Sequence, residues 1–152
     1  MRALPWSRHS RINAVEFLNT GRPPEISNVL IRAVVRDDEK QARAAAKCLR
    51  EAEVIAISLP CLCEFVWVLH RVYGFGWQDI STALTALLDT ANVLVNRPAA
   101  DAGLAVLHAG GDFADGLIAY EGRWLGGDTF VSFHKRAVSL LAKQGYHAKL
   151  LT

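Results

Sequence analysis

The chain has 152 residues, of which 51% are hydrophobic and 21% are charged, and its formal net charge is +2. This length fits one compact domain, and the composition excludes a chain that is disordered over most of its length. No apolar run approaches the roughly 18 residues of a membrane-spanning helix, and residues 1–25 lack the apolar core of a signal peptide. We therefore expect a soluble cytoplasmic protein with no membrane partner.

The charges are distributed unevenly along the chain. Residues 1–50 contain ten Lys or Arg and five Asp or Glu, whereas the remainder contains seven basic and ten acidic residues. A basic half beside an acidic half suits a protein that meets a polyanion at one place and holds a metal at another, although solvated helix faces would give the same pattern. The three cysteines, an odd number without zinc-site spacing, indicate free thiols in a reducing compartment.

Residues 1–25 differ from the rest of the chain. They are rich in Arg, show weak periodicity and end in Arg-Pro-Pro-Glu, and a Pro pair does not fit inside a central strand. We predict a poorly ordered or atypical leader over 1–25 and a folded domain over 26–152. The segment that follows, NVLIRAVVRDD at 28–38, is short enough to be either strand or helix.

Beyond this segment, amphipathic stretches alternate with short β-branched ones. Pro at a helix start and Gly after a helix end mark several boundaries. The pattern predicts strands that are separated by helices, which is typical of an α/β/α sandwich with a short parallel sheet. The expected helices are 38–52, 60–74, 77–90, 98–110, 112–126 and 134–145, and the expected strands are 54–58, 92–96 and 129–133.

Glu64 is the only charged side chain between Val54 and Leu69. Its apolar neighbours at helical spacing predict a buried stripe on the same helix. A carboxylate in such surroundings is costly unless it is paired or bound to a metal. The alternatives are that Glu64 points out of the helix end or pairs with Arg71 or another basic residue.

Asp112 and Asp115 lie three residues apart, directly before an apolar run. They suit a helix cap followed by an acidic first turn, and equally one half of a hard-metal site. Because ligands collect at the carboxyl ends of strands in α/β sheets, we expect these two residues and Glu64 to converge at one sheet edge. Three carboxylates there would repel one another without a cation such as Mg²⁺ or Mn²⁺, which would lower the pKa of a bound water and stabilise a pentavalent phosphate.

Four segments in this order resemble the PIN-domain ribonucleases, and within them the VapC-like toxins of bacterial toxin–antitoxin pairs. The resemblance covers about residues 26–145 and rests on ISNVLIRAVVRDD, SLPCLCEFVWVLHRVYG, GGDFADGLIA and TFVSFHKRAVSLL. It implies a PIN-like fold and a Mg²⁺-dependent (or Mn²⁺-dependent) endoribonuclease with an acidic site. Such toxins are usually homodimers that act on RNA and are neutralised by a small cognate antitoxin protein.

The resemblance assigns roles to individual residues of this chain and also reveals two departures. Ile26 stands where the family has its first metal-binding Asp, and a neutral His134 stands where an Asp usually follows the late strand. The chain is therefore expected to be an impaired ribonuclease, or alternatively an inactive PIN-like module that binds an antitoxin or RNA. The implied catalytic residues are Glu64, Asp115 and Asp112, the implied metal ligands are Asp115 and Glu64, and the supporting residues are Asn28, Ser27 and His134.

A third hypothesis, that the chain is an α/β protein of unrelated function whose carboxylates are caps and surface groups, is disfavoured by the isolated charge of Glu64. Ile26 and His134 favour the binding module over an efficient ribonuclease.

Overall fold

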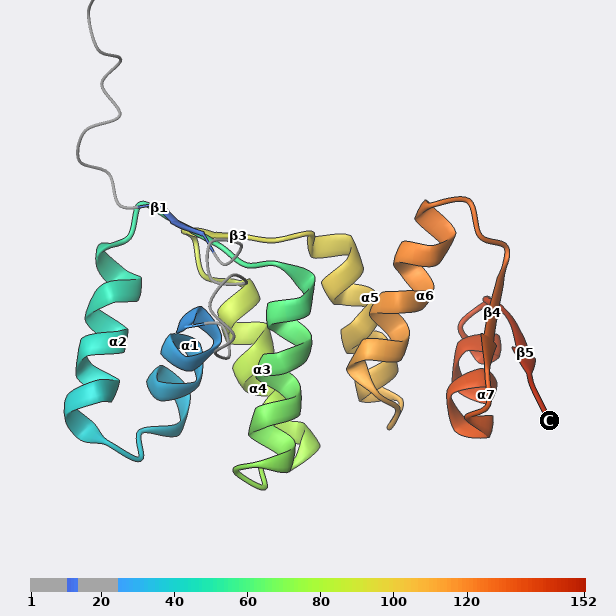
Figure 1. The fold of residues 1–152 in the computed structure, drawn as a ribbon, viewed down its shortest axis with the longest axis horizontal. Helices are drawn as coiled ribbons and strands as arrows, with labels where there is room; N and C mark the ends of the chain where they lie inside the picture. Colours follow the sequence, from blue (N-terminus) through green and yellow to red (C-terminus); the bar gives the residue numbers. More distant parts are fainter. Residues whose placement is uncertain (1–10, 14–24) are drawn as a thin grey trace, which may run out of the picture.

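The computed structural model describes residues 11–13 and 25–152, with side chains described from residue 29 onward (Figure 1). No helix in these residues is both long enough and apolar enough to cross a membrane. The helices of the described part are α1 (Glu25–Val35), α2 (Glu39–Glu51), α3 (Leu59–Arg71), α4 (Trp77–Leu88), α5 (Arg97–His108), α6 (Phe113–Trp124) and α7 (Lys135–Lys143). The strands are β1 (Arg11–Asn13), β2 (Val54–Ala56), β3 (Val93–Leu94), β4 (Thr129–Ser132) and β5 (His147–Leu150).

Local signals in the sequence explain where the helices begin. Asp38 caps α2 by accepting a hydrogen bond from the backbone N–H of Gln41 at 3.0 Å. Ser58 caps α3 in the same way, with Pro60 in its first turn, where a missing N–H has no cost. Segment 28–38, which fitted either strand or helix, belongs mainly to α1.

All strand pairs in the described residues are parallel, and the predicted α/β class is confirmed. The strands form two sheets, however, in the orders β1-β2-β3 and β4-β5. β2, which precedes Glu64, and β4, which precedes His134, therefore belong to different sheets, so any convergence of Glu64 with Asp112 and Asp115 depends on the packing of α3 against α6. β1 lies within the predicted leader, and the other residues of 1–24 lie outside the described part of the chain.

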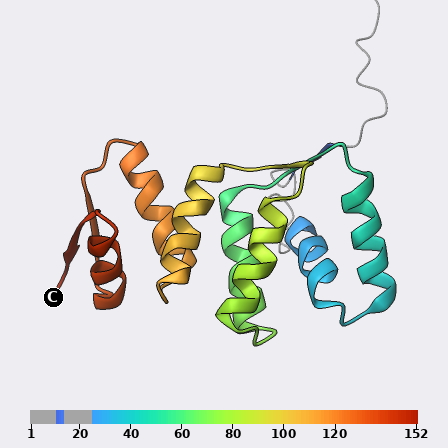
Figure 2. The same ribbon diagram turned by 180° about the vertical axis from the view of Figure 1, so that it is seen from behind.

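The helices lie side by side along the long axis of the molecule, and the view from behind shows the same arrangement (Figures 1 and 2). The main core is formed by buried residues of α1, β2, α3, α4, α5 and α6, with Phe65, Leu69 and Leu84 fully buried. A smaller cluster around Val106, Ala119 and Leu141 joins α7 and the β4-β5 sheet to α5 and α6. The start of α6 faces α3 across one cavity and α7 across another.

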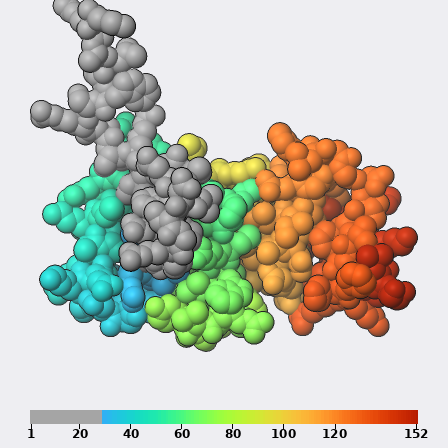
Figure 3. All heavy atoms as spheres, viewed as in Figure 1, coloured from blue at the N-terminus to red at the C-terminus, as the bar shows by residue number. Residues whose placement is uncertain are grey.

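Two glycines allow α5 and α6 to approach each other closely. A Cβ at Gly116 of α6 would overlap the backbone carbonyl oxygen of Ala102 on α5, and one at Gly103 would meet the ring of Phe113 at 2.6 Å. In the space-filling view the atoms of α5 and α6 in turn lie beside those of α3 (Figure 3), and α5 also packs against α4. Since Gly116 directly follows Asp115, this close packing fixes the acidic end of α6.

Candidate functional site

Glu64 lies beside the buried stripe of α3 rather than within it. Leu62, Phe65 and Leu69 of this stripe are fully buried, as the sequence pattern predicts, whereas Glu64 is half-buried. It lines a cavity of about 490 Å³ together with Asp112 of α6. No ion pair of the described residues contains Glu64 or Arg71, so the structure gives no support to a Glu64–Arg71 pair.

Asp112 is the cap of α6 and also lines the cavity beside Glu64. Its Oδ1 accepts a hydrogen bond from the backbone N–H of Ala114 at 2.9 Å, and this satisfies one of the free N–H groups at the helix start. Asp115 lies in the first turn of the same helix. The structural and the chemical interpretations of this pair of carboxylates are therefore compatible, because the capping bond occupies only one oxygen of Asp112.

A second cavity, of about 360 Å³, brings Asp112 and Asp115 together with His134. His134 precedes α7, and its backbone N–H donates a hydrogen bond to Ser132 Oγ at 3.0 Å. Asp112 lines both cavities, so the two spaces meet at this residue. The structure thus gathers Asp112, Asp115 and His134 around one space and places Glu64 in the neighbouring one.

Asp115 has a raised pKa, and the physical cause is first its burial and then the negative charge of Asp112. The positive character of His134 opposes this effect and lowers the pKa in part. Burial and a like charge both disfavour the ionised carboxylate. The ionised form of Asp115 is therefore destabilised, and a bound cation would stabilise it.

Asp115→Asn is expected to stabilise the protein more at pH 7 than at pH 3.5. Because the folded-state pKa of Asp115 lies above the unfolded value of about 3.9, the folded protein holds this proton more tightly. The contribution to stability is complete below the unfolded pKa and is lost as the pH rises through the folded pKa. Urea unfolding of both proteins at the two pH values measures the difference.

The exposed carboxylate of Asp79, in the first turn of α4, supplies the matched control. Asp79→Asn should show no comparable gain at the higher pH. An equal effect of Asp115→Asn at both pH values would contradict a raised pKa at Asp115.

The pKa values of the two thiols on α3 are raised by burial and by the same neighbouring carboxylates. Burial and the charge of Glu64 raise the pKa of Cys61 to about 12. Burial raises the pKa of Cys63 to about 11, with smaller contributions from Asp112 and Glu121. Since the thiolate is the reactive form of cysteine, both side chains are protonated at neutral pH and act as packing groups.

The donors around the two cavities match a hard cation in kind but only partly in arrangement. Mg²⁺ is commonly bound through one or two carboxylates, with water and substrate oxygens completing its shell, and the pair Asp112 and Asp115 suits that mode. No three Asp, Glu, His or Cys side chains in the described part of the chain are placed so that they could share one ion. Ser27 and Asn28 lie in the first turn of α1, and their side chains fall outside the described part.

The sequence alone favours a packing role for the tryptophans that line these cavities, although an exposed tryptophan could also stack a base. Trp67 and His70 lie three and six residues after Glu64 on α3, and Trp77 begins α4. Arg136 of α7 lines the second cavity beside Asp115. The spacing from Glu64 to Trp67 to Arg71 was a usable signal, because residues three and four apart share one face of a helix.

The family model described as the PIN domain matches residues 27–120, more than half of the chain. The chain therefore belongs to the PIN-domain family, whose members generally are divalent-metal-dependent nucleases. The match begins one residue after Ile26 and includes Glu64, Asp112 and Asp115. Comparison with curated proteins and comparison with solved structures each gave no match.

Proposed function

We propose that this protein is a VapC-like endoribonuclease of a toxin–antitoxin pair whose catalytic centre is impaired. The observation that carries the proposal is the grouping of Asp112, Asp115 and His134 around one cavity. Glu64 lines the adjoining cavity, which Asp112 also lines. The partners expected on this basis are RNA, a cognate antitoxin protein and a second copy of the chain.

Asp115 and Asp112 would hold the Mg²⁺ or Mn²⁺ ion in this proposal, and Glu64 would approach it from the neighbouring cavity. Such an ion supplies a water of lowered pKa and neutralises charge on the phosphate. The raised pKa of Asp115 supports this role, because a crowded carboxylate gains the most from a cation. Asp112 is oriented by its bond to Ala114, so its geometry is fixed before an ion arrives.

Two residues support the view that the centre is impaired. Ile26 has no atom that can bind a cation, and a histidine such as His134 brings no negative charge in either protonation state. The described carboxylates do not gather three ligands around one point. The same facts favour the alternative function, an inactive PIN-like module that binds an antitoxin or RNA without cleaving it.

Incubation of a total RNA pool with the unmodified protein and Mg²⁺ is expected to give little or no cleavage above the Asp115→Asn variant. The physical reason is that Ile26 removes one negatively charged ligand and His134 a second, so the ion is held weakly and with poor geometry. Gel analysis of the RNA after incubation with and without Mg²⁺ measures this, with Asp79→Asn as the control for a carboxylate elsewhere.

Strong cleavage by the unmodified protein that is lost in Asp115→Asn would support the proposed site but contradict the view that its catalytic centre is impaired. Strong Mg²⁺-dependent cleavage that is insensitive to Asp115→Asn would show that the site lies elsewhere in the chain.

A further inference from the structure

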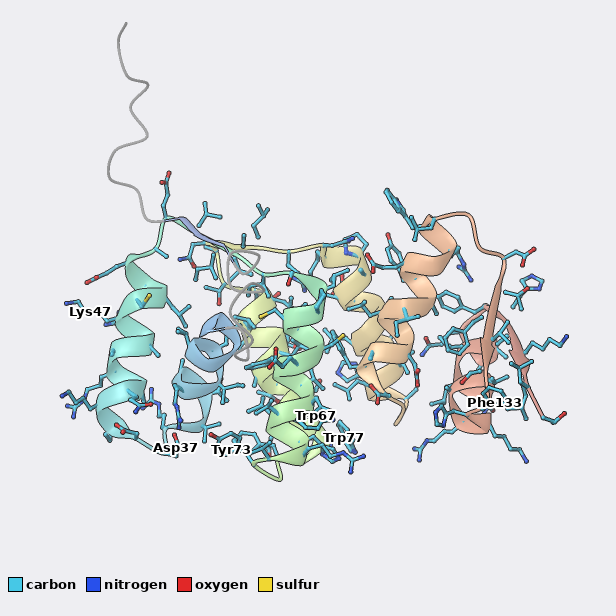
Figure 4. The ribbon with its side chains drawn as sticks, viewed as in Figure 1. Asp37, Lys47, Trp67, Tyr73, Trp77 and Phe133 are labelled. Carbon is cyan, nitrogen blue, oxygen red and sulfur yellow. The ribbon has the colours of Figure 1, made fainter. Side chains whose placement is uncertain are left out.

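Two tryptophans present exposed ring surface at the cavity beside Glu64. Trp67 of α3 is 58% exposed and Trp77 of α4 is 42% exposed, and both line the 490 Å³ cavity with Asp112. They lie near the same end of α3 and α4 (Figure 4). Exposed indole rings in a hollow next to carboxylates are unusual, because large aromatic side chains normally bury most of their surface.

Trp77 is held in place on one side of its ring. His70 stacks against it with ring centroids 3.8 Å apart and an interplanar angle of 25°. The imidazole is itself fixed, since His70 Nδ1 donates a hydrogen bond to the backbone carbonyl of Phe75 at 3.3 Å, and a carbonyl can only accept. A ring fixed in this way loses little further freedom when a ligand stacks on it.

Trp77 also connects the hollows of this surface. It lines the cavity of Glu64 and Asp112 and the cavity of Asp115 and His134. A ligand that extends from Trp67 past Trp77 therefore reaches the acidic end of α6. We call this path, from Trp67 through Trp77 to Asp115, the aromatic groove.

A cation stands near each end of the aromatic groove. Arg71 lines the cavity with Trp67, and Arg136 lines the cavity with Asp115. The Arg136 guanidinium lies against Gly110, close enough that a Cβ there would be 2.7 Å from Nη2. Neither arginine forms an ion pair with a described residue, so both remain available for phosphate oxygens.

We infer that the aromatic groove binds single-stranded nucleic acid, with an unpaired base stacked on Trp67 or Trp77 and the backbone phosphates near Arg71 and Arg136. Aromatic side chains that stack bases and basic side chains that follow the backbone are the two elements of single-strand recognition. A duplex has no free base face to offer, so it is excluded from this mode. The inference rests on the proposal that the acidic site acts on a polynucleotide phosphate.

Fluorescence anisotropy with a short labelled RNA strand, the full chain and Mg²⁺ tests the inference, with gel analysis to show that the RNA stays intact. Trp67→Ala and Trp77→Ala are each expected to weaken binding about tenfold, the loss of one stacked base. Trp124→Ala is the matched control, because Trp124 is 77% exposed and ends α6 outside these cavities. Its affinity should equal that of the unmodified protein.

Further measurements show whether a loss of affinity comes from lost stacking or from unfolding, and whether RNA and DNA strands bind differently. Trp67→Phe should keep most of the affinity because a ring remains, and thermal melting of each variant shows that the fold is retained. If Trp77→Ala unfolds through the loss of its contact with His70, the Trp67 pair decides the result. A DNA strand of the same sequence shows whether the base alone or also the ribose is recognised, and a duplex of the same RNA should bind more weakly.

Two results would overturn the inference: duplex binding as tight as single-strand binding, or equal affinities for Trp67→Ala and Trp124→Ala. The results that would contradict the proposed function differ from those that would contradict the aromatic groove. Tryptophan-dependent binding together with no cleavage by an Ile26→Asp variant would contradict the ribonuclease proposal alone. Cleavage by Ile26→Asp with no loss of affinity in Trp67→Ala would contradict the aromatic groove alone.

Discussion

Ile26→Asp is expected to recover Mg²⁺-dependent RNA cleavage, with a gain of about 10²-fold or more over the unmodified chain. Ile26 lies in the first turn of α1, one residue before the segment matched by the PIN family. A carboxylate at the start of a helix is also compatible with the fold, because the helix dipole favours negative charge there. The gain comes from a ligand that raises the affinity for the metal and improves its position.

Initial cleavage rates of a defined RNA, measured at several Mg²⁺ concentrations, report this gain. Ile26→Asp with His134→Asp should be at least as active as Ile26→Asp alone, because it restores a second negative charge. Ile26→Asn is the matched control, since it has nearly the shape of Asp without the charge, and it should recover little activity.

Adding Asp115→Asn to Ile26→Asp should abolish the recovered cleavage. No gain from Ile26→Asp, in a protein whose melting curve is unchanged, would show that the missing ligand is not what limits activity. The inactive binding module would then be the better description of this chain.

Gly116→Ala is expected to lower the free energy of unfolding by about 1–3 kcal/mol, the usual cost of an extra methyl group in a tightly packed contact. The new Cβ would overlap the backbone carbonyl oxygen of Ala102 and approach Val106 at 2.8 Å. A backbone carbonyl cannot move aside as a flexible side chain can, so α5 and α6 must separate. Urea unfolding measures the loss.

Gly122→Ala on the same helix is the control for helix propensity. A Cβ at Gly122 meets no atom within 4 Å, so the change should leave the stability equal or raise it by up to about 1 kcal/mol. If both variants change stability by the same amount, close packing of α5 on α6 is not what Gly116 provides.

Most helices could be predicted because their signals are local. Asp38 and Ser58 begin helices as caps, and the apolar stripe of Leu62, Phe65 and Leu69 marks the buried face of α3. β5 was not predicted, because His-Ala-Lys-Leu has no β-branched residue. The strand is formed by its pairing with β4, a contact that no local pattern encodes.

The acidic site could be predicted in part for the same reason. The isolated charge of Glu64 and the spacing of Asp112 and Asp115 are visible in the sequence, and the structure places all three residues on two adjoining cavities, while their catalytic role stays a prediction. The contribution of Trp77 depends on how α4 packs against α3, which brings its ring onto His70. The division of the strands into two sheets is likewise a property of tertiary packing.

The hydrogen bond from Ala114 to Asp112 has a consequence for the thermodynamics of ligand binding. The rotational freedom of this carboxylate is lost when α6 forms, so a ligand that binds it later does not incur that entropic cost again. The same bond stabilises the start of the helix. The stability of α6 and the affinity of Asp112 for a ligand therefore both depend on this hydrogen bond. A substitution at Asp112 would lower both together.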